Sequence, residues 1–398
     1  MIDVTVALAG PMATLMLAGL GATVIKVENP LAPDSARTNP PYLGRDGVTL
    51  ARRNDDDMSI SSLNRGRGKL AVTLNLEHPE ARAVFADLVR GADILVENNS
   101  PWVMDRLGVG YAWASEINPR IIFTSLSAFG ADEPGGGWDA LVQAQSGIMW
   151  TSGKPEDPPI RVGVPLGDTV TPVYAVAGTL AALEQRHRTG RGQHVDVSML
   201  GVLTSLVVTE PYDVQERVGI PMRTGNTMPR LAPFGVFRAK DGHVGLAAPT
   251  DKAASGLYEA IGRPDLEQDP RFRLRDDRVK HAAELDQIIE AWTSQHTVKE
   301  AVAIFERHLV LAAEVRTPAV AVRDPRVVRR GETSRLAHPD YGPTDDVYGT
   351  GLPIRFSGSR TGFDQPAARL GQHNAAVYGG RLGYSTERIA KLHADGVI

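Results

Sequence analysis

The sequence contains no cysteine among its 398 residues. Disulfide bonds, a thiolate nucleophile and cysteine-ligated metal sites are therefore excluded. Its charge is nearly balanced, because 43 lysine and arginine residues stand against 47 aspartate and glutamate residues. This balance gives no reason to expect binding to nucleic acid or to an acidic membrane surface. No apolar run reaches membrane-spanning length and the N-terminal segment lacks the basic start of a signal peptide, so we expect a cytoplasmic protein.

Two kinds of cofactor site also find little support in the sequence. The ten histidines are scattered, and no pair has zinc-ligand spacing with a third partner. Gly19 and Gly21 form a G-x-G pattern, but they precede the second expected strand and no third glycine follows at the required spacing. We therefore expect neither a metal ion nor a bound dinucleotide.

The first half of the chain alternates strand-like and helix-like segments, which predicts an α/β domain with a parallel sheet. Residues 4–9 and 23–27 have β-rich patterns and flank a helical period at 13–20. Residues 35–62 are rich in proline, aspartate and arginine, show no clear period, and are expected to run over the surface. The alternation continues with expected strands at 70–74, 94–97, 121–126 and 194–198, and with expected helices at 79–90 and 170–188.

The pattern changes after about residue 220, and a chain of 398 residues is too long for one small core. Two β-rich segments flank Asp241-Gly242, a strong hairpin signal, and three helical stretches follow. We expect an α/β domain that begins with 1–220 and a smaller α+β domain at 225–325. The C-terminal segment, 326–398, is rich in glycine, proline and histidine and ends in an expected helix.

Asp168 stands directly before the apolar, alanine-rich helix expected at 170–188. A carboxylate at the start of a helix faces the positive end of the helix dipole and several unpaired N–H groups. Such an aspartate can cap the helix, or it can serve as an anionic nucleophile beside an oxyanion site. The local pattern taken alone favours the cap.

Two further patterns are compatible with a ligand site. The glycine-interrupted basic stretch Asn64-Arg65-Gly66-Arg67-Gly68-Lys69 enters an expected strand and can hold a phosphate-bearing ligand, but a solvated turn explains it equally well. Asn98 and Arg106 follow the strand that ends at Glu97, where open α/β sheets place their ligands. Routine capping and surface pairing account for these two residues as well.

Motifs in a fixed order over essentially the whole chain resemble the family III CoA-transferases, also called the CaiB/BaiF type. This family includes formyl-CoA and carnitine-CoA transferases and α-methylacyl-CoA racemases. The resemblance implies a Rossmann-like large domain to which residues 326–398 return, a smaller α+β domain, and an interlocked homodimer. The segments that carry it are Ala9-Gly10-Pro11, Leu20-Gly21-Ala22-Thr23-Val24-Ile25-Lys26-Val27-Glu28, Val96-Glu97-Asn98, Asp105-Arg106-Leu107-Gly108, Asn118-Pro119-Arg120, Gly167-Asp168, Thr189-Gly190-Arg191-Gly192-Gln193 and Leu370-Gly371-Gln372-His373-Asn374.

In that family the aspartate at the position of Asp168 is the nucleophile. The resemblance therefore implies transfer of CoA from an acyl-CoA donor to a small carboxylic acid through an aspartyl anhydride and an enzyme–CoA thioester. Coenzyme A and its thioesters are then substrates, and no permanently bound cofactor is implied. By the same resemblance, the residues that bind CoA or substrate are Asn98, Arg106, Arg37, Leu74 and Asp139.

The racemase branch of the family needs a second acid–base residue, a histidine directly before an aspartate. This sequence has Trp138-Asp139 at that place, which favours transfer over racemisation. A racemase or epimerase and a CoA-binding homologue without turnover stay open as alternatives. Three departures from formyl-CoA transferases bear on the substrate, because a glutamine, an arginine and a glycine are replaced by Leu8, Asn29 and Pro172.

Overall fold

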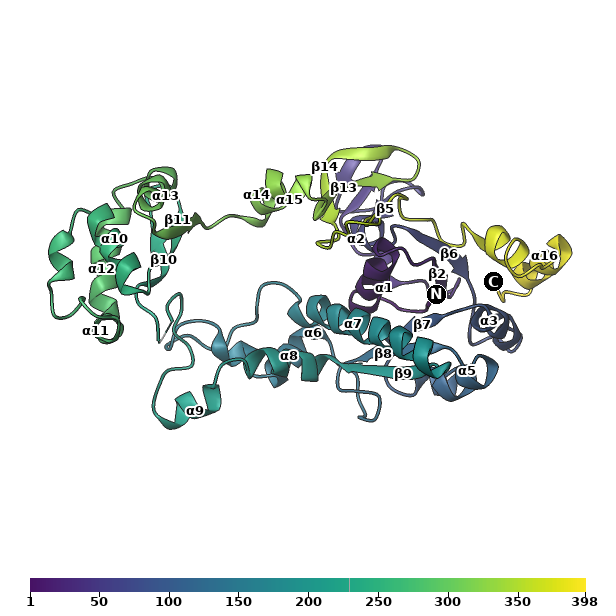
Figure 1. Cartoon of the computed structure of the whole chain (residues 1–398). Helices are drawn as coiled ribbons and strands as arrows, with labels where there is room; N and C mark the ends of the chain where they lie inside the picture. Colours follow the sequence, from purple (N-terminus) through teal and green to yellow (C-terminus); the bar gives the residue numbers. More distant parts are fainter. Residues whose placement is uncertain (229) are drawn as a thin grey trace. The chain divides into compact units, whose positions relative to one another are not determined.

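The computed structural model describes residues 1–228 and 230–398, and these form two compact units. The first unit comprises residues 1–146, 163–206 and 322–398, and the second comprises residues 147–162 and 207–321. The chain thus leaves the first unit twice and returns to it for its C-terminal segment (Figure 1). The sequence pattern placed residues 147–162 and 207–220 in the large domain, but they belong to the second unit. Backbone hydrogen bonds join the segment 147–162 to the rest of this unit. For example, the N–H of Gly225 donates to the carbonyl of Gly153 at 2.9 Å.

A parallel sheet of six strands lies at the centre of the first unit, in the order β6-β2-β1-β7-β8-β9. This is the strand order of the doubly wound Rossmann fold, so the expected Rossmann-like architecture is confirmed. The chain moves outward from β1 in both directions, and the topological switch point lies at the carboxyl ends of β1 and β7. The strands are β1 (Ile2–Asp3), β2 (Val24–Glu28), β6 (Lys69–Thr73), β7 (Ile94–Glu97), β8 (Ile122–Ser127) and β9 (Gln193–Ser198).

Alternating side chains of the central strands supply two apolar layers, one on each face of the sheet. Ile94 and Val96 belong to one layer and Leu95 to the other, as the pleat of a strand requires. The first layer is covered by α1 (Ala9–Gly19), α6 (Asp139–Gln145), α7 (Leu166–Thr189) and α8 (Met199–Val207). The second is covered by α3 (Ala81–Arg90), α4 (Val103–Arg106), α5 (Tyr111–Ile117), the π-helical turn η4 (Ala375–Gly379) and α16 (Thr386–Ala394).

Two helices begin earlier than the sequence pattern predicts. The expected strand at 4–9 is wrong, because Ala7 adopts a left-handed φ of 64° that turns the chain into α1 at Ala9. Apolar residues at 4–9 imitate a strand, but they form this turn and the start of the helix, and Val6 and Ala7 are exposed. The second helix, α7, begins at Leu166 rather than at residue 170, so Asp168 lies inside its first turn.

Residues 35–62 form ordered structure rather than an irregular surface excursion. They contain η1 (Ser35–Arg37), the antiparallel strands β3 (Tyr42–Gly44), β4 (Gly47–Thr49) and β5 (Met58–Ser59), and α2 (Ile60–Arg65). Leu63 of α2 packs in one apolar cluster with Leu336 of the hairpin β13 (Thr333–His338) and β14 (Gly342–Thr350), which follows α15 (Pro325–Arg329). Strands of two or three residues are too short to show a period, which is why the sequence pattern missed them.

The helix α7 also differs from expectation in its apolar character. It is the one described helix that is long and apolar enough to cross a membrane by length and composition, although 39% of its apolar window is buried inside the protein. The core helix of a globular protein passes the same test. Glycine, threonine and proline interrupt the apolar residues of this helix, so no continuous run is visible in the sequence.

The second unit has its own apolar core around the antiparallel sheet β10-β11-β12. The hairpin predicted around Asp241-Gly242 is confirmed, because Arg238 pairs with His243 in its register. Its strands are β10 (Phe234–Arg238), β11 (His243–Ala247) and β12 (Leu311–Glu314). Its helices are η2 (Ile148–Thr151), α9 (Tyr212–Arg217), α10 (Asp251–Ala260), η3 (Pro264–Glu267), α11 (Arg275–Lys280), α12 (Ala282–Thr293), α13 (Val298–Arg307) and α14 (Pro318–Ala321).

Gly192, between α7 and β9, provides a test of this packing. A Cβ atom at this position would lie 1.9 Å from the carbonyl oxygen of Ile121, so the Gly192→Ala substitution has to displace backbone. We expect it to lower the free energy of unfolding by about 1–3 kcal/mol, measured by denaturant titration. Gly358→Ala is the control, because nothing lies within 4 Å of its Cβ position. Equal stability of the two variants would contradict the close approach.

Candidate active site

A cavity of about 540 Å³ opens at the carboxyl ends of β1, β7 and β8, where open α/β sheets place their ligands. Its walls come from the residues that follow these strands and from the ends of the helices α1, α2, α6, α7 and α8. The lining residues whose chemistry matters most are Leu8, Arg65, Asn98, Asp139, Asp168 and Thr171.

Asp168 is a partly exposed carboxylate in this cavity. Its helix begins after Pro165 without a side-chain cap, so the capping interpretation of Asp168 is wrong. Within the described part of the chain, its carboxylate accepts no hydrogen bond. Burial first, and then the nearby charge of Asp139, raise the pKa of Asp168 to about 6, whereas the charge of Arg65 acts in the opposite direction.

Asp139 holds the backbone directly before Asp168. One carboxylate oxygen, Oδ1, accepts the N–H of Gly167 at 2.7 Å, and the other, Oδ2, accepts Nε2 of Gln143 at 2.8 Å. A Cβ atom at position 167 would lie 2.6 Å from the sulfur of Met199, so glycine permits this close approach. Asp139 thus satisfies an N–H at the open end of α7 and places a second negative charge beside Asp168.

Pro172 weakens the helix immediately behind Asp168. In a regular helix, residue 172 would donate its N–H to the carbonyl of Asp168, but proline has no N–H and its ring crowds that carbonyl. The helix continues through this position to Thr189. The first turn of α7, which carries Asp168, therefore depends on Asp139 more than it would in an uninterrupted helix.

Asn98 fixes the turn that forms the opposite wall of the cavity. Its side-chain oxygen accepts the N–H of Val6 at 2.8 Å, and its Nδ2 donates to the carbonyl of Val6 at 3.0 Å. The next residue, Ala7, has the uncommon left-handed backbone and donates its N–H to Oδ1 of Asp34 at 2.9 Å. Side chains from two other segments thus determine where the chain turns into α1.

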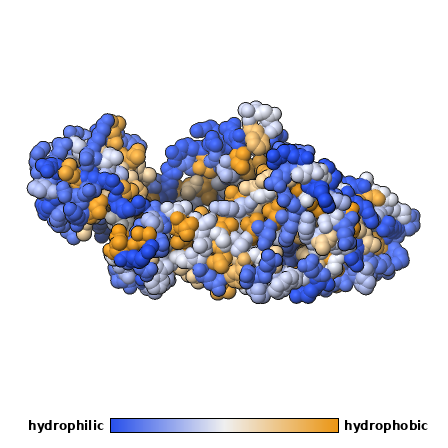
Figure 2. All heavy atoms as spheres, turned by 60° about the horizontal axis from the view of Figure 1, so that its bottom comes forward, coloured by the Kyte–Doolittle hydropathy of each residue, from blue (hydrophilic) through white to orange (hydrophobic). Residues whose placement is uncertain are grey.

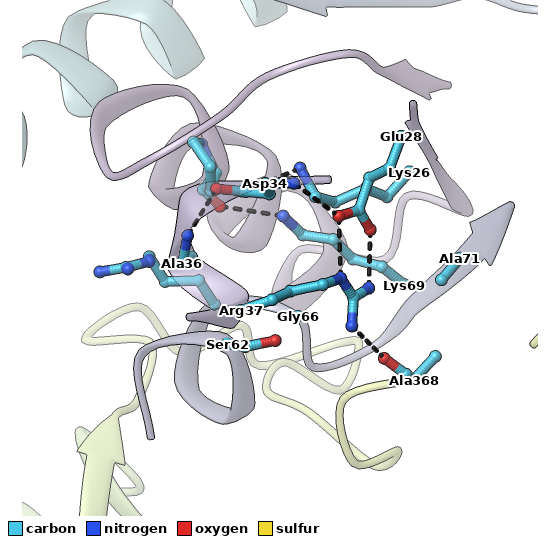
Figure 3. A pocket seen from close by; sticks show the side chains of 12 residues that line it. Lys26, Glu28, Asp34, Ala36, Arg37, Ser62, Gly66, Lys69, Ala71 and Ala368 are labelled. Carbon is cyan, nitrogen blue, oxygen red and sulfur yellow. Dashed lines mark hydrogen bonds and ion pairs between the residues drawn. The ribbon is translucent and has the colours of Figure 1, made fainter. Parts of the chain in front are cut away.

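A buried ion network holds Asp34 in place (Figure 3). Oδ2 of Asp34 lies 3.1 Å from Nζ of Lys26, and Arg37 forms a two-point ion pair with Glu28. Burial by itself would raise the pKa of Asp3, but the charges of two lysines hold that pKa below its ordinary value. The network consists of Asp3, Lys26, Glu28, Asp34, Arg37 and Lys69.

The structure brings some of the expected site residues together and leaves others apart. Asn98 and Asp139 line the cavity with Asp168. Arg37 instead pairs with Glu28 beside an adjoining cavity of about 20 Å³. The remaining two do not line the Asp168 cavity: Arg106 is an exposed residue at the end of α4, and Leu74 is buried in the core after β6. A role of these residues in binding CoA stays a prediction.

Sequence reasoning did not single out two residues of the cavity, because it considered Arg65 only as part of the basic stretch 64–69 and did not consider Thr171. The basic stretch 64–69 is neither a solvated turn nor a single phosphate cradle, because Arg67 donates to Ser334 and Lys69 to Asp3, both within the fold. Only the first of its three basic residues, Arg65, lines the cavity. Thr171 follows Asp168 by three residues on α7, a spacing that puts both on one helix face.

Two of the three departures from formyl-CoA transferases also have a structural context. Leu8 lines the cavity at the start of α1, where its side chain offers no hydrogen bond to a ligand. Asn29 hydrogen-bonds to Asn75 and to the N–H of Leu31. Among the residues that the structure describes, no group of three histidine, aspartate or glutamate side chains is arranged to hold a metal ion.

Comparison with known proteins identifies the family. The family model described as CoA-transferase family III matches residues 1–374. The chain belongs to this family of enzymes. The succinyl-CoA–D-citramalate CoA-transferase of Chloroflexus aurantiacus is 31% identical over 98% of this chain and 95% of its own length. The acetyl-CoA:oxalate CoA-transferase of Acetobacter aceti is 34% identical over 94% of this chain and 93% of its own.

Solved structures agree with this assignment. A CaiB/BaiF family protein from Brucella suis superposes with a TM-score of 0.82 and 30% sequence identity, covering 95% of this chain and 97% of that protein. The α/β fold expected from the resemblance is thereby confirmed, and so is the expectation of a family III CoA-transferase.

The raised pKa of Asp168 predicts how stability depends on pH. This carboxyl group ionises with a pKa of 3.8 in the unfolded chain and of about 6 in the folded protein. Its ionisation therefore destabilises the folded protein at neutral and higher pH, and this destabilisation disappears below about pH 4, where the group is protonated in both states. We expect Asp168→Asn to raise the melting temperature at about pH 8 and to lose that advantage at about pH 4. Thermal unfolding across this range is the measurement, and a pH-independent difference would contradict the account.

Proposed function

We propose that this enzyme moves CoA from an acyl-CoA donor to a small carboxylic acid, with Asp168 as the covalent nucleophile. The observation that carries the proposal is an unpaired carboxylate at the switch point of a Rossmann-like sheet, in a cavity that lacks a thiol or a grouped metal site among the described residues. Its position in the cavity leaves its oxygens free to react rather than to complete a structural contact.

The chemistry requires two exchanges at Asp168. A carboxylate oxygen attacks the thioester carbonyl, the C–S bond breaks, and CoA leaves as a thiolate while a mixed anhydride forms. The thiolate then attacks the aspartyl carbonyl of the anhydride, which releases the donor acid and leaves CoA in a thioester with Asp168. The acceptor carboxylate attacks this thioester, the C–S bond breaks, and a second mixed anhydride forms between Asp168 and the acceptor. The displaced thiolate then attacks the acceptor carbonyl of that anhydride and breaks its bond to the aspartyl oxygen, which gives the new acyl-CoA and restores the aspartate. Every step exchanges one carboxylate or thiolate for another, so no proton transfer or redox partner is needed.

The surroundings of Asp168 suit such a nucleophile. A pKa of about 6 leaves the group largely ionised at neutral pH, while its partial burial removes some of the hydration that would blunt a carboxylate. The first turn of α1, with Leu8 and Ala9 at the wall, directs the positive end of a helix dipole toward the cavity. This end and the charge of Arg65 favour the negative charge that develops on the thioester oxygen.

The nature of the substrates follows in part from the wall of the cavity. The relatives named above act on D-citramalate and on oxalate. Leu8 offers no hydrogen bond to an oxalate-like acid, and we propose another small carboxylic acid as acceptor. Asn98, Arg106, Arg37 and Leu74 remain the proposed contacts for CoA, which is too long to lie wholly in the Asp168 cavity. We propose no permanently bound cofactor and a cytoplasmic location.

We also propose that the enzyme is an interlocked homodimer. Three large side chains of α7 are 44–49% exposed, namely Leu180, Tyr174 and Val173. Figure 2 shows apolar residues among the polar ones on the face that it draws. A row of apolar side chains along a long helix is typical of a surface that a second copy covers. Light scattering of the purified protein tests this expectation.

The nucleophile is tested with a panel of acyl-CoA thioesters and intact-mass spectrometry. We expect a CoA-sized adduct on the wild-type enzyme, located on the peptide that contains Asp168. Asp168→Ala removes the attacking oxygen and should reduce transfer by at least about 1,000-fold, while CoA still raises its melting temperature. Asp213→Ala, at an exposed surface ion pair, is the matched control. An adduct or full transfer activity in Asp168→Ala would exclude Asp168 as nucleophile.

A further inference from the structure

Arg65, at the end of α2, carries a guanidinium group without a partner among the residues that the structure describes. Its Nε atom is buried and has no hydrogen-bond partner, and no ion pair of Arg65 is present among the described residues. Burial lowers the pKa of its guanidinium, against the opposing charges of Asp34 and Asp168. A buried charge costs free energy unless it is paired, so this group is incomplete as it stands.

Other arginines of the first unit have guanidinium groups whose N–H donors are bonded within the protein. Arg37 makes a two-point pair with Glu28, and Arg67 donates to Ser334 and to a backbone carbonyl. Both arginines connect segments of the folded chain to one another. Arg65 has no such structural use, and among the described residues that line the Asp168 cavity it is the one cation. The guanidinium fork is suited to the two oxygens of a carboxylate.

A second polar group in the same cavity is also unsatisfied. Thr171 is fully buried, and its hydroxyl oxygen has no hydrogen-bond partner within the described ranges 1–228 and 230–398. Its helix places it on the same face as Asp168. Two unpaired donors beside one nucleophile indicate that the cavity is built for an anionic ligand rather than for an apolar one.

We infer that Arg65 receives the carboxylate of the incoming acid when Asp168 carries CoA. This inference rests on the proposed function. In the free enzyme, the charge of Arg65 is offset in part by Asp168. Once Asp168 becomes a thioester its negative charge disappears, and the guanidinium then has Asp34 as its remaining acidic neighbour. The acid anion replaces the lost charge, which holds the acid at the nucleophile after the first exchange and not before it.

The same reasoning explains how an anion can enter this cavity at all. Two carboxylates, those of Asp139 and Asp168, line it and would repel an acid from the free enzyme. Formation of the thioester removes one of them, and Arg65 opposes the other. The acid therefore binds to the CoA-loaded enzyme in preference to the free one, which is the order that the two exchanges require.

Steady-state kinetics of Arg65→Met and Arg65→Lys test the inference. We expect kcat/KM for the acid to fall at least about tenfold in Arg65→Met. We expect kcat/KM for the acyl-CoA to fall much less, because acyl-CoA reacts with the free enzyme, in which the charge of Arg65 affects mainly the ionisation of Asp168. Arg65→Lys should recover part of the loss, since it keeps the charge without the fork. Arg188→Met, which removes an exposed arginine at the end of α7, is the control for net charge.

Two more measurements separate this role from a structural one. The acid limb of kcat/KM for acyl-CoA should move to higher pH in Arg65→Met but not in Arg65→Lys. Two charged groups face Asp168: Arg65 favours its ionised form and Asp139 opposes it, so the pKa of Asp168 should rise when the charge of Arg65 is removed. A CoA adduct should still form in Arg65→Met on long incubation, so the proposed nucleophile is checked independently. A loss confined to kcat/KM for acyl-CoA would assign Arg65 to a CoA phosphate and overturn the inference, as would unchanged kinetics with the acid.

Discussion

The cavity depends on the left-handed turn that follows β1. Ala7 holds a backbone conformation that costs roughly 1–2 kcal/mol for a residue with a Cβ, and it does so at the switch point of the sheet. Asn98 and Asp34 maintain it by accepting the N–H groups of Val6 and Ala7. Beneath them, the ion network keeps Asp34 fixed through Lys26. Without this turn α1 could not begin at Ala9, and the wall opposite Asp168 would be absent.

Asp168 experiences opposing electrostatic influences, and their balance suits the nucleophile that we propose. Desolvation and Asp139 raise its pKa, while Arg65 lowers it. A carboxylate held by several hydrogen bonds would be fully ionised but weakly nucleophilic, whereas a deeply buried one would be neutral at physiological pH. The structure provides neither extreme. Asp139 secures the position of the helix end through Gly167 without a hydrogen bond to the carboxylate of Asp168.

The sequence could predict the architecture because strand-like and helix-like segments alternate regularly along the part of the chain that forms the central sheet. Five of the six strands, all except β1, lie where the alternation of segments predicts them, and the order of the motifs identified the family. The sequence could not predict the turn at Ala7, because its conformation is imposed by Asn98, 92 positions from Val6 in the chain. The short strands around Leu43 and Met58 were missed for a related reason, since their pairing is specified by packing against β13 rather than by their own period.

The site shows the same division between local and distant information. Asp168 and Asp139 are recognisable from the motifs in which they occur, and Asn98 from its place after a strand. Arg65 could not be distinguished from Arg67 in a stretch where both stand beside glycine, because only the folded chain directs one into the cavity and the other under β13 and β14. Thr171 has an ordinary helical position, and only the folded chain shows that its hydroxyl lacks a partner in the part of the protein that the structure describes.

The central claim is that the acid in transit and Asp168 share an oxygen atom. A single measurement addresses it. Transfer is run with an acceptor acid labelled with oxygen-18 in its carboxylate, and the mass of the peptide that contains Asp168 is then measured by mass spectrometry. The mechanism predicts that label from the acid enters the Asp168 carboxylate, because the thiolate cleaves the anhydride on the acyl side. Transfer that proceeds while Asp168 stays unlabelled would contradict the mechanism.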